Sequence, residues 1–158
     1  MDNLSKELLV FFTAMIPFID IKAAVPLGFQ MGLSKISIYF FAVAGMLIPG
    51  VLNLFLLGPI TNFARKKSKF LEAFFSKLFE KTRKDHHSKV KKLGPLFLLL
   101  FVGIPVPGSG AMTGALIAFV FGMEAWSSLT FIAIGTIISV GLLMGGVESV
   151  SALINLFT

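Results

Sequence analysis

The sequence predicts an all-α integral membrane protein made of two inverted repeats, each a re-entrant helical hairpin followed by a spanning helix. Composition is the first observation behind this prediction: 56% of the 158 residues are hydrophobic, 14% are charged, and the mean hydropathy is +0.90. A typical soluble domain is about a quarter charged. The second observation is that short apolar runs, broken by proline, alternate with longer uncharged runs. The third is a basic segment that divides the chain into two similar halves.

The first half begins with two short apolar stretches, residues 8–19 and 23–31, on either side of a polar break after Pro17. About twelve helical residues reach ~18 Å, whereas the hydrocarbon core of a bilayer is ~30 Å thick. We therefore expect a re-entrant hairpin here rather than two spanning helices. Residues 36–63 carry no charge and are long enough to span, and kinks are expected where Pro49 interrupts the run.

Most of the positive charge lies in a connector, residues 64–92. Eleven of the fourteen basic residues fall between positions 65 and 92 together with three acidic ones, so this stretch carries +8 and the rest of the chain −2. The positive-inside rule places it in the cytoplasm. Its phenylalanines recur at helical spacing, which predicts a basic amphipathic helix. The apolar face is expected to lie on the membrane surface, or to pack on the protein's own helices or a second subunit; nucleic-acid binding is not expected.

The second half repeats the pattern of the first. Residues 93–106 and 111–123 are short apolar stretches around a proline- and glycine-rich break, and residues 126–147 are long enough to span. The matched positions are Ile16 with Ile104, Pro17 with Pro105, Ala23 with Ala111, Gly32 with Gly122, and Gly45 with Gly135. We therefore expect a single membrane domain over residues 1–158, divided into repeat 1 (4–63), the connector (64–92) and repeat 2 (93–158).

The predicted topology follows from the cytoplasmic connector. A re-entrant hairpin returns to the side from which it entered, and one helix then crosses the bilayer. The first hairpin must therefore enter from outside and the second from the cytoplasm, so the repeats are inverted and both chain ends lie outside. Inverted repeats with broken helices near the midplane are typical of transporters. We expect a multi-pass protein of the cytoplasmic (inner) membrane.

Three residues near the first break are candidates for substrate or ion binding: Asp20, Lys22 and Pro26. Ionisable side chains within membrane segments are costly, and a functional role is the default hypothesis for them. Asp20 and Lys22 are two residues apart, so they do not face each other on a helix, although they can pair in a non-helical turn. The alternative is that both lie near the surface and extend to water.

The second break supplies further candidates for the binding site, which are Pro105, Pro107, Gly108, Ser109, Gly110 and Thr113. Ser109 is a suitable N-cap, and glycines let backbone N–H groups approach a ligand. The N-terminus of a half-helix in a low dielectric favours an anion such as a phosphate. The alternative is a structural hairpin tip whose glycines serve helix packing.

Enzymatic, metal or cofactor chemistry is not expected. The chain has no cysteine, and its two histidines stand together in the charged connector. The sequence contains no catalytic triad, zinc-protease, Walker A or dinucleotide motif. Asn53 and Glu148 are weaker candidates: Asn53 is expected to bond a neighbouring helix, and Glu148 to lie near the outer surface.

The two breaks resemble the motifs of a known family. Residues 16–28, IPFIDIKAAVPLG, are similar to the first motif of the small multi-drug export protein family, and residues 104–115, IPVPGSGAMTGA, to its second. The resemblance covers nearly the whole chain. It implies a compact relative of the DedA/VTT membrane proteins, which have paired re-entrant hairpins and of which some move lipids, including lipid-linked phosphates. Asp20 and Lys22 stand where the pattern usually has Glu and Arg, and the second break lacks the arginines that DedA proteins carry there.

Three hypotheses about function follow. The first is a transporter or scramblase for a phospholipid or lipid-linked phosphate, with the phosphate at Lys22 and the Gly108–Gly110 helix end and with Asp20 as a proton or cation site. The second is an exporter of small hydrophobic cations, coupled to protons or ions, with Asp20 as the cation partner. The third is a non-transporting membrane scaffold. The expected partners are membrane lipids, an amphipathic substrate and further copies of the chain, because two spanning helices barely enclose a polar pathway.

Overall fold

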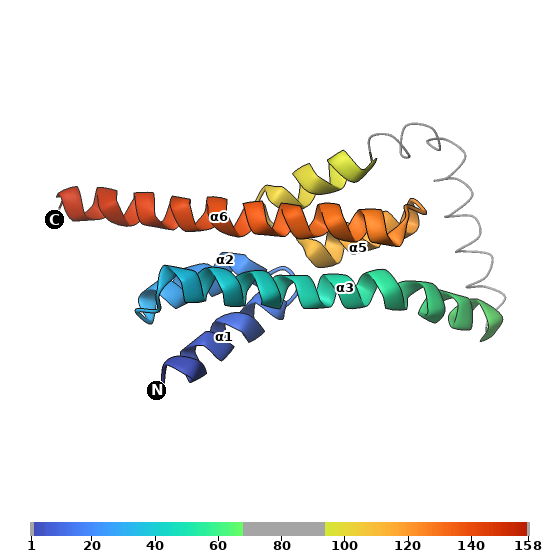
Figure 1. Ribbon diagram of the computed structural model, residues 1–158, viewed down its shortest axis with the longest axis horizontal. Helices are drawn as coiled ribbons and strands as arrows, with labels where there is room; N and C mark the ends of the chain where they lie inside the picture. The colour runs from blue at the N-terminus through green and yellow to red at the C-terminus, as the bar shows by residue number, and fades with distance from the viewer. Residues whose placement is uncertain (1, 68–93, 158) are drawn as a thin grey trace.

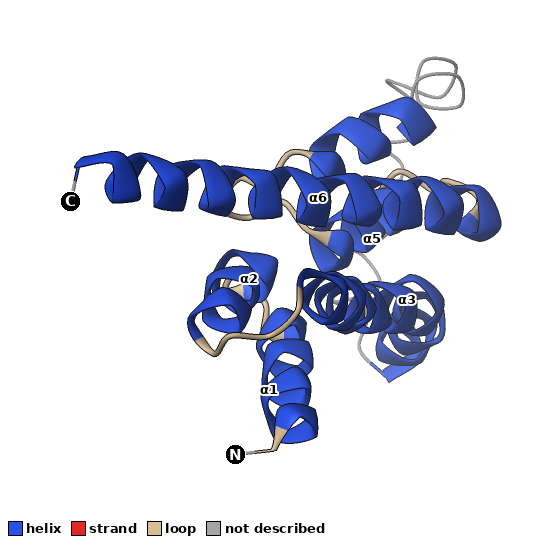
Figure 2. Ribbon diagram, turned by 60° about the vertical axis from the view of Figure 1, so that its left-hand side comes forward, coloured by secondary structure: helices blue, strands red, loops and turns tan. Residues whose placement is uncertain are grey.

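The computed structural model describes residues 2–67 and 94–157, and every regular element in these ranges is a helix (Figure 2). The first range contains α1 (Asn3–Met15), α2 (Asp20–Gln30) and α3 (Lys35–Lys67). The second contains a helix over Gly94–Gly103, then α5 (Ala111–Val120) and α6 (Ala125–Phe157). The all-α prediction is confirmed for these residues. The predicted amphipathic helix of the connector lies mostly within residues 68–93, outside the described residues.

Two long helices, α3 and α6, form the frame of the molecule; they contact each other, run in opposite directions along its long axis (Figure 1) and cross at an angle (Figure 2). Each contains 33 residues. The segments Lys35–Thr61 and Ala125–Ala152 are long and apolar enough to cross a membrane, which requires about 20 helical residues. The two helices therefore match the two predicted spans in length and composition.

The shorter helices are grouped around the middle of this frame. In the first half, α1 leads toward the centre of the molecule and α2 turns back from it to the start of α3 (Figure 1). In the second half, the helix Gly94–Gly103 leads toward the centre and α5 turns back to the start of α6. These four helices contain 10 to 13 residues, so they are ~15–20 Å long and too short to cross a bilayer.

Matching glycine turns connect each short helix to the long helix that follows it. The turns are centred on Gly32 and Gly122, whose φ values of +71° and +65° glycine adopts at low cost. In the first turn, the amide of Gly32 donates to the carbonyl of Phe29 at 3.0 Å, and the amide of Leu33 donates to the carbonyl of Gly28 at 3.1 Å. The same pair of hydrogen bonds recurs ninety positions later. Gly32 and Gly122, matched in sequence, thus form the same turn.

Two further glycines, on the long helices, let the backbones of short helices pack directly against them. A Cβ atom at Gly45 of α3 would collide with the carbonyl oxygen of Phe11 in α1. At Gly135 of α6, the matched position, a Cβ atom would lie 3.0 Å from the carbonyl oxygen of Leu99 and 3.0 Å from Cβ of Val102. Close packing through small residues is a principal means of joining helices in lipid, where the hydrophobic effect does not drive helix association.

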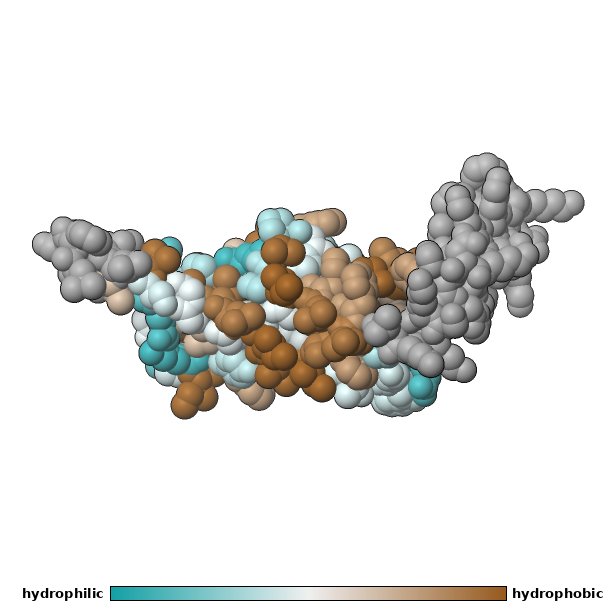
Figure 3. All heavy atoms as spheres, turned by 90° about the horizontal axis from the view of Figure 1, so that it is seen from above, coloured by the Kyte–Doolittle hydropathy of each residue, from teal (hydrophilic) through white to brown (hydrophobic). Residues whose placement is uncertain are grey.

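The buried core is narrow and the outer surface is strongly apolar. Phe12, Phe40, Trp126 and Leu142 are each more than half exposed, and hydrophobic side chains cover the middle of the face shown in Figure 3. A monomeric soluble protein rarely exposes apolar patches larger than roughly a few hundred Å². This surface is instead suited to contact with lipid tails.

The limits of the long helices differ from the sequence-based boundaries. α3 continues to Lys67 as one helix through Pro49 and Pro59, beyond the predicted end at residue 63. α6 continues past the predicted end at residue 147. Helix-breaking residues are tolerated in membrane helices when neighbouring groups satisfy the freed backbone positions. Apolar runs therefore predict the spans better than they predict where the helices end.

Gly45→Ala is expected to destabilise the protein by about 1–3 kcal/mol, because the added methyl group overpacks against the α1 backbone. The matched control is Gly145→Ala in α6, where a Cβ atom meets nothing within 4 Å. This control is expected to be neutral or stabilising by up to about 1 kcal/mol, since alanine favours a helix. Thermal unfolding in detergent measures both variants, and equal melting temperatures would contradict the close contact at Gly45.

Candidate functional site

The two breaks between the short helices meet at the centre of the molecule. Residues 16–19 separate α1 from α2, and residues 104–110 precede α5. The ammonium group of Lys22, just after the first break, donates a hydrogen bond to the carbonyl oxygen of Ser109 in the second, at 3.2 Å. This bond joins residues 87 positions apart, so the first turn of α2 is tied to the non-helical second break.

The first break has an unusual backbone. Phe18 and Asp20 both have positive φ, +68° and +37°, and the left-handed region costs a residue other than glycine about 1–2 kcal/mol. The amide of Asp20 still donates to the carbonyl of Ile16 at 2.9 Å, so the break is one tight turn. Such conformations persist only where the surroundings impose them, and they cluster at functional sites.

Asp20 and Lys22 form an ion pair directly after this turn. The Lys22 ammonium lies 2.7 Å from each carboxylate oxygen of Asp20, and the Lys22 amide donates to Oδ1 at 3.2 Å. The side chains of Asp20 and Lys22 are 11% and 20% exposed. In such a setting an unpaired charge is costly, and each charge depends on the other.

The place of this pair differs from the prediction. The sequence predicts both residues within the break, whereas Asp20 is the first residue of α2 and Lys22 lies in its first turn. They face each other because the left-handed φ of Asp20 departs from helical geometry. Pro26 lies inside α2, farther from the break.

Ser109 is not the N-cap that the sequence predicts. The N-cap of α5 is Gly110, and no side chain caps this helix. The Ser109 hydroxyl instead lies 2.6 Å from the carbonyl oxygen of Ile104 and 2.8 Å from that of Val106, and it accepts a hydrogen bond from the Val106 amide at 3.1 Å. The side chain turns back into its own loop because these backbone groups are closer than the helix. Ser109 therefore shapes the second break.

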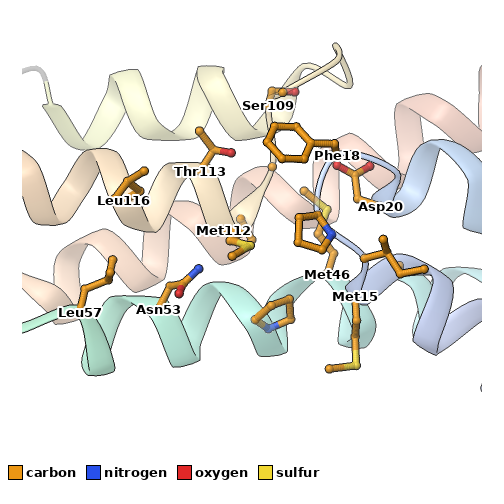
Figure 4. A pocket seen from close by; sticks show the side chains of 17 residues that line it. Met15, Phe18, Asp20, Met46, Asn53, Leu57, Ser109, Met112, Thr113 and Leu116 are labelled. Atoms are coloured by element: carbon orange, nitrogen blue, oxygen red, sulfur yellow. The ribbon is translucent and has the colours of Figure 1, made fainter. Parts of the chain in front are cut away.

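A pocket of about 230 Å³ lies beside the meeting breaks, between α3 and α5 (Figure 4). Its walls are mostly apolar and include Met15, Met46, Met112 and Phe18. Asp20 is the one charged residue among the described residues that line it. The pocket thus combines an adaptable apolar surface with a single carboxylate.

Five of the nine predicted site residues line this pocket, namely Asp20, Gly108, Ser109, Gly110 and Thr113. The other four, Lys22, Pro26, Pro105 and Pro107, are not among its lining residues. Lys22 reaches the pocket only through its contact with Asp20. The second break and the start of α5 therefore contribute backbone and small side chains rather than a basic group.

Asn53 belongs to the site more directly than the sequence predicts. Instead of serving only as a helix-to-helix contact, its amide points into the pocket from α3 (Figure 4). The available signal is that Asn53 is a strongly polar residue inside an uncharged run. The methionines and Phe18 carry no such signal, because a pocket-lining apolar residue and a lipid-facing one look alike in an apolar sequence.

The N-terminus of α5 faces a carboxylate. A Cβ atom on Gly110, its N-cap, would lie 3.3 Å from Oδ2 of Asp20. The start of a helix carries a partial positive charge, and here Asp20 already stands beside it. An anion at this helix end would meet the Asp20 carboxylate as well, so the charges do not favour the predicted phosphate site.

These features are those of a small α-helical membrane protein, with two helices long and apolar enough to span and a central pocket where the two breaks meet. A family model described as "Putative small multi-drug export protein" matches residues 20–142. The chain belongs to this family, as its two motifs predict. Comparison with curated proteins gave no match, and comparison with solved structures gave none. The relation to DedA/VTT proteins stays a prediction.

Lys22→Met is expected to lower the free energy of unfolding by about 3 kcal/mol, because it leaves a mostly buried carboxylate unpaired. Asp20→Asn/Lys22→Met removes both charges and is expected to recover most of that loss. The matched control is Lys6→Met, which loses only a hydrogen bond to the carbonyl of Met31 and is expected to cost about 1 kcal/mol. Thermal unfolding in detergent compares the three, and a double variant as unstable as Lys22→Met would contradict the electrostatic explanation.

Proposed function

We propose that the protein exports small amphipathic cations across the cytoplasmic membrane, with Asp20 as the group that binds the cation. The observation that carries this proposal is the pocket lining, in which one carboxylate stands among methionine, phenylalanine and other apolar side chains. An amphipathic cation needs an apolar surface for its body and a negative charge for its head. The family description as a multi-drug export protein supports the same class of substrate.

The lining suits substrates of varied shape. Met15, Met46 and Met112 have flexible, polarizable side chains, which fill irregular spaces and recur at promiscuous binding surfaces. Phe18 is 79% exposed and borders the same pocket. An aromatic ring near a carboxylate adds a cation–π contact for a positively charged ligand.

Lys22 supports a binding cycle at Asp20. Its ammonium group occupies the carboxylate at 2.7 Å and also donates to the carbonyl of Ser109 at 3.2 Å. A substrate cation that displaces Lys22 from Asp20 leaves it with this second acceptor, so exchange does not strand a buried ammonium group. Asp20 can hold Lys22, a substrate cation or a proton, one at a time, which is what a proton-coupled exporter requires.

The other two hypotheses receive less support from the geometry. A lipid phosphate would meet the Asp20 carboxylate in the pocket, while Lys22 is engaged by Asp20 and Ser109. A non-transporting scaffold leaves the charged pair and the pocket without a role. A homo-oligomer remains part of the proposal, because two spans enclose only a narrow pathway.

We place each pair of short helices as a re-entrant hairpin and the two halves as inverted repeats. The short lengths of these helices and the opposite directions of α3 and α6 support this placement (Figure 1). Burial also recurs at an offset of ninety residues: the buried positions Ile38, Ala42, Met46 and Leu54 of α3 correspond to the buried positions Ser128, Ile132, Thr136 and Met144 of α6. With the basic connector in the cytoplasm, both chain ends lie outside.

Single-cysteine labelling tests this topology, and the absence of native cysteine makes it clean. Serine-to-cysteine substitutions are made one at a time at Ser5, Ser34, Ser88, Ser127 and Ser151, and intact cells are treated with an impermeant maleimide. Ser5, Ser34 and Ser151 are expected to label from outside, and Ser88 and Ser127 are not. Labelling of Ser5 and Ser34 from opposite sides would make α1 and α2 a membrane crossing and would remove the re-entrant hairpin.

Asp20→Asn is expected to reduce ethidium transport into proteoliposomes roughly ten- to a hundredfold, because the cation loses its charged partner. Glu124→Gln makes the same chemical change at an exposed position before α6 and is expected to retain wild-type transport. Undiminished transport by Asp20→Asn would remove Asp20 from the mechanism. Dithionite quenching of a labelled phospholipid in the same vesicles tests the lipid alternative, and faster quenching with no ethidium transport would favour that alternative over the exporter.

A further inference from the structure

Two hydroxyl groups buried in α6 have no hydrogen-bond partner in the part of the chain that the structure describes. They belong to Thr136 and Ser139, which are 0% and 1% exposed. Serine and threonine inside helices commonly bond the carbonyl four residues earlier. Four other hydroxyls of α6 do so, at Ser128, Thr130, Ser149 and Ser151. A buried hydroxyl without a partner costs free energy, so packing alone does not explain Thr136 and Ser139.

The counterparts of these two residues line the pocket. An offset of ninety positions relates Thr136 to Met46 and Ser139 to Pro49, and both counterparts are lining residues. The glycine turns that precede α3 and α6 have this same offset, so the register rests on backbone geometry. Thr136 and Ser139 therefore occupy on α6 the place that pocket-lining residues occupy on α3. They are three positions apart and share one helix face.

Asp20 lies where the two halves meet. The register of the glycine turns pairs Asp20 with Gly110, whereas the proline motifs, offset by 88 positions, pair it with Gly108. A Cβ atom on Gly110 would lie 3.3 Å from Oδ2 of Asp20. Two related positions that touch each other lie close to the axis that relates the repeats. The Asp20 carboxylate is thus placed to serve both the pocket beside α3 and a related space beside α6.

An exposed ion pair joins α3 and α6 near the start of α3. Lys35, at the start of α3, lies 2.9 Å from Glu148 of α6. Their counterparts at the other end, Ala125 and Gly58, carry no charge, so the repeats differ at this point. The two side chains are 66% and 40% exposed, and such a pair contributes little to stability and breaks easily. The pocket extends in the opposite direction, along α3 from Met46 toward its far end.

We propose that Thr136 and Ser139 line a second cation-binding pocket, closed in this structure, which opens at the Lys35–Glu148 end when that ion pair breaks. Asp20 holds the cation while access changes from one pocket to the other. The two hydroxyl oxygens then accept hydrogen bonds from N–H groups of the cation, such as the amino groups of ethidium, or from its bound water. This inference rests on the proposed function and adds to it the site from which the cation leaves.

Accessibility of matched cysteines tests the second pocket in the full-length protein. Met46→Cys and Thr136→Cys are exposed to a charged methanethiosulfonate in right-side-out and in inside-out membrane vesicles. Met46→Cys is expected to react from the connector face and Thr136→Cys from the opposite face. Adding Lys35→Gln is expected to raise the rate at which the reagent modifies Thr136→Cys roughly two- to fivefold. This range corresponds to the free energy that an exposed ion pair typically contributes. Ile132→Cys, at a core position 1% exposed, is expected to stay unreactive.

The contrary outcomes separate this inference from the proposed function. Thr136→Cys that is unreactive from both faces, or reactive from the same face as Met46→Cys, would overturn the second pocket, although Asp20-dependent ethidium transport would still stand. Equal reactivity of Ile132→Cys and Thr136→Cys would reveal that α6 opens along its whole buried face, and this would also overturn the second pocket. Loss of Asp20 dependence in the transport assay would instead remove the proposed function.

A second variant tests the hydroxyl itself. Thr136→Val keeps the shape of the side chain and removes its unpartnered oxygen. The closed protein is expected to melt at the same or a higher temperature, whereas ethidium transport is expected to fall about fivefold, since one hydrogen bond to the moving cation is lost. Unchanged transport together with the stability gain would show that the hydroxyl has no role in binding and would overturn the inference.

Discussion

The contact between Lys22, Asp20 and the carbonyl of Ser109 holds the two halves of the chain together, joining the start of α2 to the second break. Lipid supplies no hydrogen bonds, so the proposed placement of the breaks within the membrane requires protein to satisfy their backbone groups. The Ser109 hydroxyl does this within the second break, through the backbone of Ile104 and Val106. The Lys22 ammonium group satisfies the carbonyl of Ser109 in the second break, and it neutralises Asp20 at the same time. The other elements are arranged so that this contact stays protected.

Glycine packing provides that protection. Helices of 10 to 13 residues cannot cross a bilayer and need support from the long helices. Gly45 lets α1 reach the α3 backbone, and Gly135 gives the second half the same close approach on α6. The short helices therefore end at the centre, where their breaks meet the Asp20–Lys22 pair, and the pocket forms beside that meeting point.

The two halves differ in their charges although their backbones are alike. The first half carries the Asp20 carboxylate, and the second half brings Gly110 next to it without adding a charge. The Lys35–Glu148 ion pair occurs at one end, and the related positions at the other end are uncharged. In the proposed mechanism, this difference in charge between related positions would make the two arrangements of the protein unequal in stability.

The sequence by itself determined the membrane class, the two candidate spans, the matched glycines Gly32 and Gly122, and the family, because hydropathy, run length and residue type are local properties. The tertiary structure alone decided the rest of the site. It gave the Ser109 hydroxyl nearer partners than the helix end, brought Asn53 to the pocket, and placed Asp20 at the start of α2 opposite Gly110. The physical reason is that a contact between residues nearly ninety positions apart depends on how helices pack against each other, and no local pattern in the chain records that packing.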